Sequence, residues 1–179
     1  MHRTVRGVVA TMVVTAVVLG TVSAAGAKQT KQSTAKYAKT VCGTYSKLLN
    51  DFTNYANGIG NLDQSDSAGF ASQATPQTNT FLATVKADEK TLQGVYPGIS
   101  NGKKVGKLLA TNATEIDNAI SAALSQLQSG GIAGPAVFVA NLRTLSSKIS
   151  DPFSKVTDQG LISAFQKEKT CKDVVHVIG

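Results

Sequence analysis

The sequence contains no tryptophan and very little histidine, and its two methionines, Met1 and Met12, both lie near the start of the chain. Beyond that start, the one histidine is His176, close to the C-terminus. Histidine is the usual proton-transfer group near neutral pH and a common metal ligand. The sequence therefore predicts no catalytic histidine, no histidine metal site and no thioether site for a soft metal.

Motifs of nucleophilic and nucleotide chemistry are also missing. No G-x-S-x-G elbow occurs, and a serine nucleophile would lack its histidine partner. Residues 101–107 (NGKKVGK) combine glycine with lysine but do not meet the P-loop spacing G-x-x-x-x-G-K-[ST]. We interpret this run as a turn and a helix cap, and the alternative is a basic helix start that faces an anion.

Carboxylates that are close in sequence could serve acid and base chemistry. Adjacent helical side chains point in different directions, and lysines lie on both sides of Asp88 and Glu89. A solvated charged face is therefore the simpler interpretation. Residues 61–67 place oxygen-bearing side chains at alternate positions but lack the central glycine and closing glutamate of an EF-hand. We expect no catalytic residue, metal or cofactor, and a histidine-free hydrolase is a remote alternative. The pairs considered are Asp88 with Glu89, Glu115 with Asp117, and Asp63 with Asp66.

Arginine is scarce, although the chain is basic. It has 18 lysines and arginines against 11 aspartates and glutamates, a formal net charge of +7, and its arginines are Arg3, Arg6 and Arg143. Arginine supplies the planar fork that reads bases and holds phosphates at two points, whereas lysine is a flexible point charge. Nucleic acid is therefore not an expected partner.

The lysines are clustered. Such clusters favour an anionic wall polymer or lipid headgroups as a partner, and the alternative is a face that only keeps the protein soluble. The candidate anion-binding surface consists of Lys28, Lys31, Lys36, Lys39, Lys103, Lys104 and Lys107, and a further cluster is Lys167, Lys169 and Lys172.

Residues 1–27 have the three parts of a secretory signal peptide. A positively charged start precedes the apolar run 8–22, and small residues then offer cleavage after Ala24 or after Ala27. We expect cleavage after Ala27, which leaves one domain, residues 28–179, and lowers the formal charge from +7 to +5. The protein would be secreted or held in the cell envelope. The alternative is an uncleaved anchor, because the apolar run approaches the roughly 20 residues that span a bilayer.

Export changes the interpretation of the two cysteines, Cys42 and Cys171. An even number of cysteines in an oxidising compartment predicts a disulfide. The bond would close most of the domain into a loop, which restricts the unfolded state by roughly 4 to 5 kcal/mol in the chain-entropy model. Without a C-x-x-C motif, a structural role is favoured over a redox role.

Apolar residues recur every three or four positions, the pattern of amphipathic helices. One helix is expected to begin with Pro76 as its first residue and to end at Pro97-Gly98, with Val95 and Tyr96 on its apolar stripe. Helical stripes are predicted over residues 37–59, 75–96, 105–127 and 135–149, with a short helix at 68–73 and a last helical piece over 153–165.

These helices predict an all-α fold, an up-and-down antiparallel four-helix bundle with a fifth short C-terminal helix, pinned by the cysteine pair. Phe52, Leu109 and Leu145 should be nearly buried. Tyr37, Tyr45 and Tyr55 share the first stripe and are interpreted as packing residues, although a tyrosine can also bind haem iron.

We expect a non-enzymatic binding protein that uses an exposed helical face. The alternative is a carrier that holds an apolar ligand in a cavity lined by residues such as Phe81, Leu109 and Phe138. The valine- and alanine-rich leader and the Ala, Thr, Ser and Gln content resemble small secreted helical proteins of high-GC bacteria. That resemblance implies a bacterial envelope and no site residues.

Overall fold

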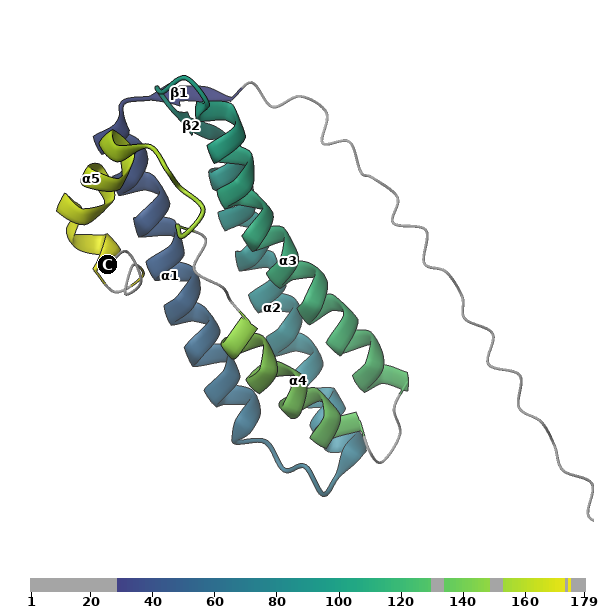
Figure 1. Cartoon of the computed structure of the whole chain (residues 1–179). Coiled ribbons are helices and arrows are strands. Elements are labelled where there is room, and N and C mark those ends of the chain that lie inside the picture. Colours follow the sequence, from purple (N-terminus) through teal and green to yellow (C-terminus); the bar gives the residue numbers. More distant parts are fainter. Residues whose placement is uncertain (1–28, 130–133, 149–152, 173, 175–179) are drawn as a thin grey trace, which may run out of the picture.

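The computed structural model describes residues 29–129, 134–148, 153–172 and 174. The predicted leader, Lys28 and His176 lie outside these residues. Within the described ranges the chain is mostly helical, as predicted (Figure 1). Its elements are β1 (Thr30–Gln32), α1 (Thr34–Gly60), α2 (Ser67–Gln93), β2 (Val95–Pro97), α3 (Gly102–Ser129), α4 (Gly134–Lys148), α5 (Gln159–Lys167) and the 3-10 turn η2 (Lys169–Cys171).

Helix α1 follows the strongest apolar stripe of the sequence. Ser33 caps its start by accepting a hydrogen bond from the backbone N–H of Lys36 at 3.4 Å. Asn61 ends it, with its N–H donating to the carbonyl of Asn57 at 3.2 Å. Both the helix and its predicted stop near Gly60 are confirmed.

Helix α2 begins earlier than predicted. Asp66 is its N-cap and accepts a hydrogen bond from the N–H of Gly69 at 3.0 Å, so the helix passes through Pro76 instead of starting there. Phe70, Ala74 and Thr78 are all buried on α2. The buried stripe therefore extends back to Phe70 through the small Ala74 and the polar Thr78. The separate short helix at 68–73 and the proline start were therefore wrong.

The end of α2 was also wrongly predicted. Gly94 caps the helix by donating to the carbonyl of Lys90 at 3.0 Å. Val95 and Tyr96 leave the helix and form β2, which pairs in parallel with β1 in the register Thr30 to Val95. Three residues are too few to show the alternation by which a strand is predicted from sequence.

The three long helices lie side by side, and two short helices cover the remaining faces (Figure 1). Helix α2 packs between α1 and α3, while α4 packs mainly on α3 and also contacts α1 and α2. Helix α5 and η2 pack on α1. Figure 1 places them beside the half of α1 nearest the strands, whereas α4 lies toward the opposite end.

The last helical piece is shorter than predicted. Phe153 and Val156 precede α5 in a turn, although both are buried. The ring of Phe153 meets Tyr45 edge-on at 5.6 Å and Phe165 at 4.8 Å between centroids. Asp158 then caps α5 through the N–H of Leu161 at 2.8 Å. Aromatic packing holds this segment in place without a helix.

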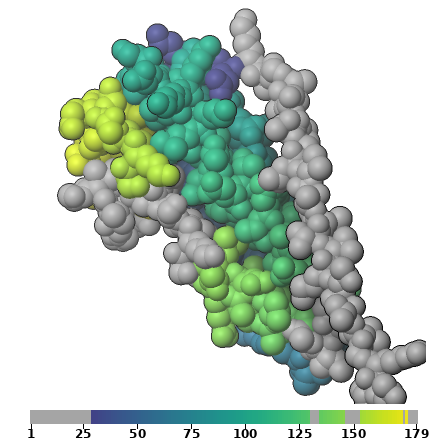
Figure 2. Space-filling view, turned by 45° about the vertical axis from the view of Figure 1, so that its right-hand side comes forward, coloured from purple at the N-terminus to yellow at the C-terminus, as the bar shows by residue number. Residues whose placement is uncertain are grey.

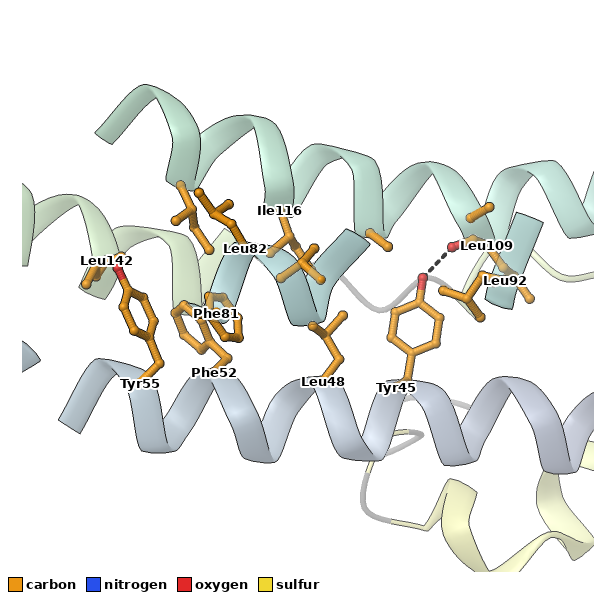
Figure 3. Close-up of a cluster of buried hydrophobic side chains, with 14 of the residues drawn as sticks. Tyr45, Leu48, Phe52, Tyr55, Phe81, Leu82, Leu92, Leu109, Ile116 and Leu142 are labelled. Carbon is orange, nitrogen blue, oxygen red and sulfur yellow. Dashed lines mark hydrogen bonds between the residues drawn. The ribbon is translucent and has the colours of Figure 1, made fainter. Parts of the chain in front are cut away.

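The core lies between the helices and is rich in aromatic rings (Figure 3). Phe52 and Leu109 are 5% and 0% exposed, as predicted. Leu145 is only half-buried, so its predicted burial was wrong. It lies in the last turns of α4, beside a shallow hollow between α3 and α4 that leaves one side of it uncovered.

The predicted disulfide is present. Cys42 in α1 and Cys171 in η2 are bonded, their Cα atoms lie 4.8 Å apart, and both residues are buried. The bond fixes the C-terminal part of the domain to the third turn of α1.

Candidate functional site

The structure brings the separate lysine clusters of the sequence to one end of the molecule. This end is formed by β1, β2, the first turns of α1 and α3, and residues 153–172 (Figure 1). We call this end of the molecule, with its lysines, the lysine end. They are Lys31, Lys36, Lys39, Lys103, Lys104, Lys107, Lys155, Lys167, Lys169 and Lys172, and all are exposed.

Two glycines let α3 approach the strands at this end. A Cβ atom on Gly102 would lie 1.9 Å from the carbonyl oxygen of Pro97, and one on Gly106 would lie 2.9 Å from that of Val95. The spacing of four places both glycines on one face of α3. The glycines of the 101–107 run therefore serve packing against β2, and its lysines point outward.

The strands and the disulfide set the positions of the other clusters. Pairing of β1 with β2 holds the start of α1 beside the start of α3. The disulfide and the contact between Tyr37 and Phe165, at 6.5 Å between centroids, hold α5 and η2 against α1. Figure 2 shows α5 and the residues before it (yellow) packed beside the first turns of α3 (teal).

The charge of the lysine end is unbalanced. Among β1, residues 34–41, residues 102–109 and residues 153–172, the carboxylates are Asp158 and Glu168, and both cap helical turns. Among the described residues, the ion pairs are those of Lys47 with Asp51 and Asp88, away from this end. Among the described residues of this end, positive charge is therefore in large excess over negative charge.

Helix dipoles add to this excess of positive charge. Helices α1 and α3 both begin here, and neither has an acidic residue in its first turn. The N-terminal end of a helix carries a partial positive charge, so a lysine there is unfavourable by about 0.3–1 kcal/mol. Lys36, Lys103 and Lys104 occupy such positions. Lys103 has a compensating contact, because its ammonium lies over the ring of Tyr96 at 5.7 Å from the centroid. Folding stability does not account for Lys36 and Lys104.

A hollow lies within the lysine end, between α3 and the segment before α5. Its volume is about 390 Å³, and it is open to solvent on one side. Lys155, which sequence clustering missed because it stands alone in the chain, lies here opposite Lys104 and Lys107. The remaining lining residues are Asn101, Val105, Leu108, Thr111 and Thr157.

Comparison with protein-family models, curated proteins and solved structures finds no match to the chain.

Asp88 and Glu89 face different helices. The Asp88 carboxylate lies 3.2 Å from the ammonium of Lys47 on α1, whereas Glu89 accepts a 2.6 Å hydrogen bond from the hydroxyl of Thr114 on α3. Burial raises the pKa of Asp88 above its ordinary value, and Lys47 opposes that rise. The pair is a set of interhelical contacts and does not converge on a shared site.

The other carboxylates are equally separate. Glu115 is exposed, while burial raises the pKa of half-buried Asp117. Asp63 accepts hydrogen bonds from the N–H and hydroxyl of Ser65, which lower the pKa of Asp63, and Asp66 caps α2. Within the described ranges, no three His, Cys, Asp or Glu side chains come together to hold a metal ion.

The tyrosines of the first stripe are packing residues, as interpreted. The Tyr45 hydroxyl donates to the backbone carbonyl of Leu109 (Figure 3). The Tyr55 hydroxyl lies 2.9 Å from that of Thr78. Tyr37 is fully buried against Phe165. These phenols are enclosed in the core.

The residues proposed to line a carrier cavity pack against other side chains. Phe81 stacks on Tyr55 at 4.6 Å between centroids, and Phe138 meets Phe70 edge-on at 6.2 Å. They and Leu109 lie outside the hollow described above and outside two others, of about 200 and 270 Å³, at the α3–α4 and α1–α5 surfaces.

Among the described helices, none is long and apolar enough to cross a membrane.

Proposed function

We propose that this protein is a non-enzymatic, extracytoplasmic binding protein that contacts an anionic polymer of a bacterial cell envelope through its lysine end. The observation that carries the proposal is the meeting of three lysine clusters, distant in sequence, at one end with few carboxylates. The proposal includes export by the leader 1–27 and an up-and-down arrangement of α1 to α4.

The placement of the lysines supports binding over simple solubility. Lys167 lies in the last turn of α5, where the helix dipole favours a cation. Lys36 and Lys104 lie in first turns, where the dipole disfavours a cation. A surface needed only for solubility could place its charges without that cost.

A polymer fits the lysine end better than a membrane does. Membrane-surface helices combine lysines with an apolar face. Within the described residues, the exposed large hydrophobic side chain is Val137 on α4, away from the lysine end. The lysines extend over α1, α3 and α5, which suits a flexible chain of repeating charges.

The test is binding of the purified, oxidised protein to soluble poly(glycerol phosphate). Release of counterions from a polyanion makes such binding steeply weaker as salt rises. The variant K36Q/K39Q/K169Q should lower the affinity at least tenfold at low salt and reduce the salt slope. Equal binding to neutral dextran would contradict the proposal, and so would preferential binding to phosphatidylglycerol vesicles.

A charge-matched control separates the site from the overall charge. Asn54, Gln64 and Gln73 are exposed near the α1–α2 connection, at the opposite end (Figure 1). The variant N54D/Q64E/Q73E lowers the net charge by the same amount as the lysine variant. It should keep polymer affinity within about twofold; an equal loss in both variants would show that only net charge matters.

Export has its own test. Fractionation of the native host should place the protein in the medium or envelope, and N-terminal sequencing should find Lys28 as the first residue, or Ala25 if cleavage follows Ala24. Material that remains in the cytoplasm with its leader intact would contradict the export part of the proposal.

A further inference from the structure

The hollow between α3 and the segment before α5 combines an apolar floor with a cationic rim. Val105 and Leu108 fit the apolar stripe of α3, yet both are only half-buried and face the hollow, while the adjacent Leu109 is fully buried. The core therefore covers only part of these two apolar side chains. Lys104 and Lys107 stand beside them on the same wall.

The opposite wall is held firmly. Phe153 and Val156 point inward and are 1% and 5% exposed, and a 2.9 Å hydrogen bond joins the N–H of Val156 to the carbonyl of Phe153. The intervening Lys155 and the following Thr157 are exposed and line the hollow. Phe153 and Val156 thus fix the position of this wall.

Three ammonium groups surround the hollow without compensation. Within the part of the chain that the structure describes, Lys104, Lys107 and Lys155 make no ion pair. Thr111 and Thr157 add hydroxyl groups to the rim. A volume of about 390 Å³ is at the small end of the range of about 300–1,000 Å³ for small-molecule sites.

We propose that this hollow binds a single-chain amphiphile with an anionic headgroup, the headgroup among Lys104, Lys107 and Lys155 and the hydrocarbon over Val105 and Leu108. Charge complementarity selects the headgroup, and the half-buried apolar floor selects the chain. The inference deepens the proposed function, because these lysines belong to the lysine end. It moves the predicted carrier role from the core to the surface.

The probe is decanoate, titrated into the ¹⁵N-labelled oxidised protein and followed by amide chemical shifts. The shifts should saturate and centre on Thr111 and Thr157. Decanol lacks the charge and butyrate lacks most of the chain, so each should bind at least tenfold more weakly. Equal binding of decanol, or shifts that do not saturate or lie elsewhere, would overturn the site.

Matched variants test the two walls. L108Q removes apolar floor without changing charge, and K155Q removes one cation; each should weaken decanoate binding at least fivefold. Leu145 is a half-buried leucine at a different hollow, so L145Q should leave decanoate affinity unchanged. Thermal melts test whether L108Q is folded. If L108Q is unfolded, V105T replaces it as the floor variant. Unchanged affinity in the floor and rim variants would overturn the proposal.

The lysine variant K36Q/K39Q/K169Q separates this inference from the proposed function. It leaves the hollow intact, so decanoate affinity should persist while polymer affinity falls. If the protein binds decanoate but does not bind poly(glycerol phosphate), the hollow is a binding site and the polymer proposal is wrong. If the protein binds the polymer but does not bind decanoate, the polymer proposal is supported and the proposed site in the hollow is wrong.

Discussion

Tyr45 on α1 donates its phenolic hydrogen to the backbone carbonyl of Leu109 on α3, across the centre of the core (Figure 3). Both residues are almost fully buried. The contact joins the two helices whose first turns carry much of the lysine end, so it contributes to their relative position.

Tyr45→Phe should lower the free energy of unfolding by about 0.5–1.5 kcal/mol, the net value of one hydrogen bond. Denaturant titration measures the change. Tyr55→Phe is the matched control, because its partner Thr78 still donates to the carbonyl of Ala74 at 2.8 Å and is not left unsatisfied. An equal or larger loss for Tyr55→Phe would contradict this ranking.

The buried phenols should make the fold sensitive to alkali. Burial raises the pKa of Tyr55 to about 12 and raises the pKa of Tyr37 and of Tyr45 further. In the unfolded chain these groups ionise near pH 10, so stability is complete below that pH and is lost as pH rises toward about 12 and beyond. Tyrosinate absorbance should rise together with unfolding; full ionisation near pH 10 in a folded protein would contradict the burial.

Glycine substitutions should separate packing sites from free sites on the helices. Gly102→Ala and Gly106→Ala should each destabilise the protein by about 1–3 kcal/mol, because the new methyl group meets backbone atoms of β2 that cannot move independently. Gly43→Ala, inside α1 with no atom within 4 Å of the new Cβ, should stabilise by about 0.5–1 kcal/mol. Thermal or denaturant unfolding measures all three, and destabilisation of equal size at Gly43 would refute the distinction.

Removal of the disulfide by Cys42→Ala and Cys171→Ala should cost about 4–5 kcal/mol, since the bond closes a loop over a sequence separation of 129. Because both sulfurs are buried, mild reductant should leave the bond of the native protein intact until denaturant is added. Rapid reduction of the native protein would contradict that burial.

Two interhelical carboxylates should produce a pH dependence in the acidic range. Burial raises the pKa of Asp88 and of Asp117, so their contribution to stability is complete below the ordinary aspartate pKa and is lost as pH rises through the raised values. The variant D88N/D117N should therefore gain stability relative to wild type as pH rises from about 3.5 to 6.5. Asp63→Asn should show the opposite trend, because hydrogen bonds from Ser65 lower the pKa of Asp63. Parallel curves for all three proteins would contradict these shifts.

The sequence predicted the helices best where large apolar residues mark the stripe. The stripes of α1 and α3 are confirmed, and α4 (Gly134–Lys148) covers most of the stripe predicted over 135–149. The start of α2 was missed because its stripe continues through Ala74 and Thr78, which carry little hydrophobic signal. Asp66, the N-cap, was the residue in the sequence that could have indicated the true start of α2. It was overlooked because Pro76 was interpreted as the first residue of the helix.

The candidate site was only partly predictable. The individual clusters could be found, because like charges recur within a few residues of sequence. Their meeting at one end depends on a parallel strand pair, two glycine contacts and a disulfide that act over long sequence distances. Lys155 had no signal in sequence, since only packing of Phe153 and Val156 places it beside α3.

The covalent link between α1 and η2 has a consequence for the order of the lysine end. Lys169 and Lys172 lie close to the bonded Cys171, so the disulfide adds a covalent constraint to the packing that holds their cluster against α1. In the reduced chain, only the non-covalent packing of α5, η2 and Phe153 would hold the third cluster against α1. The cationic surface is therefore better ordered in the oxidised protein than in the reduced one.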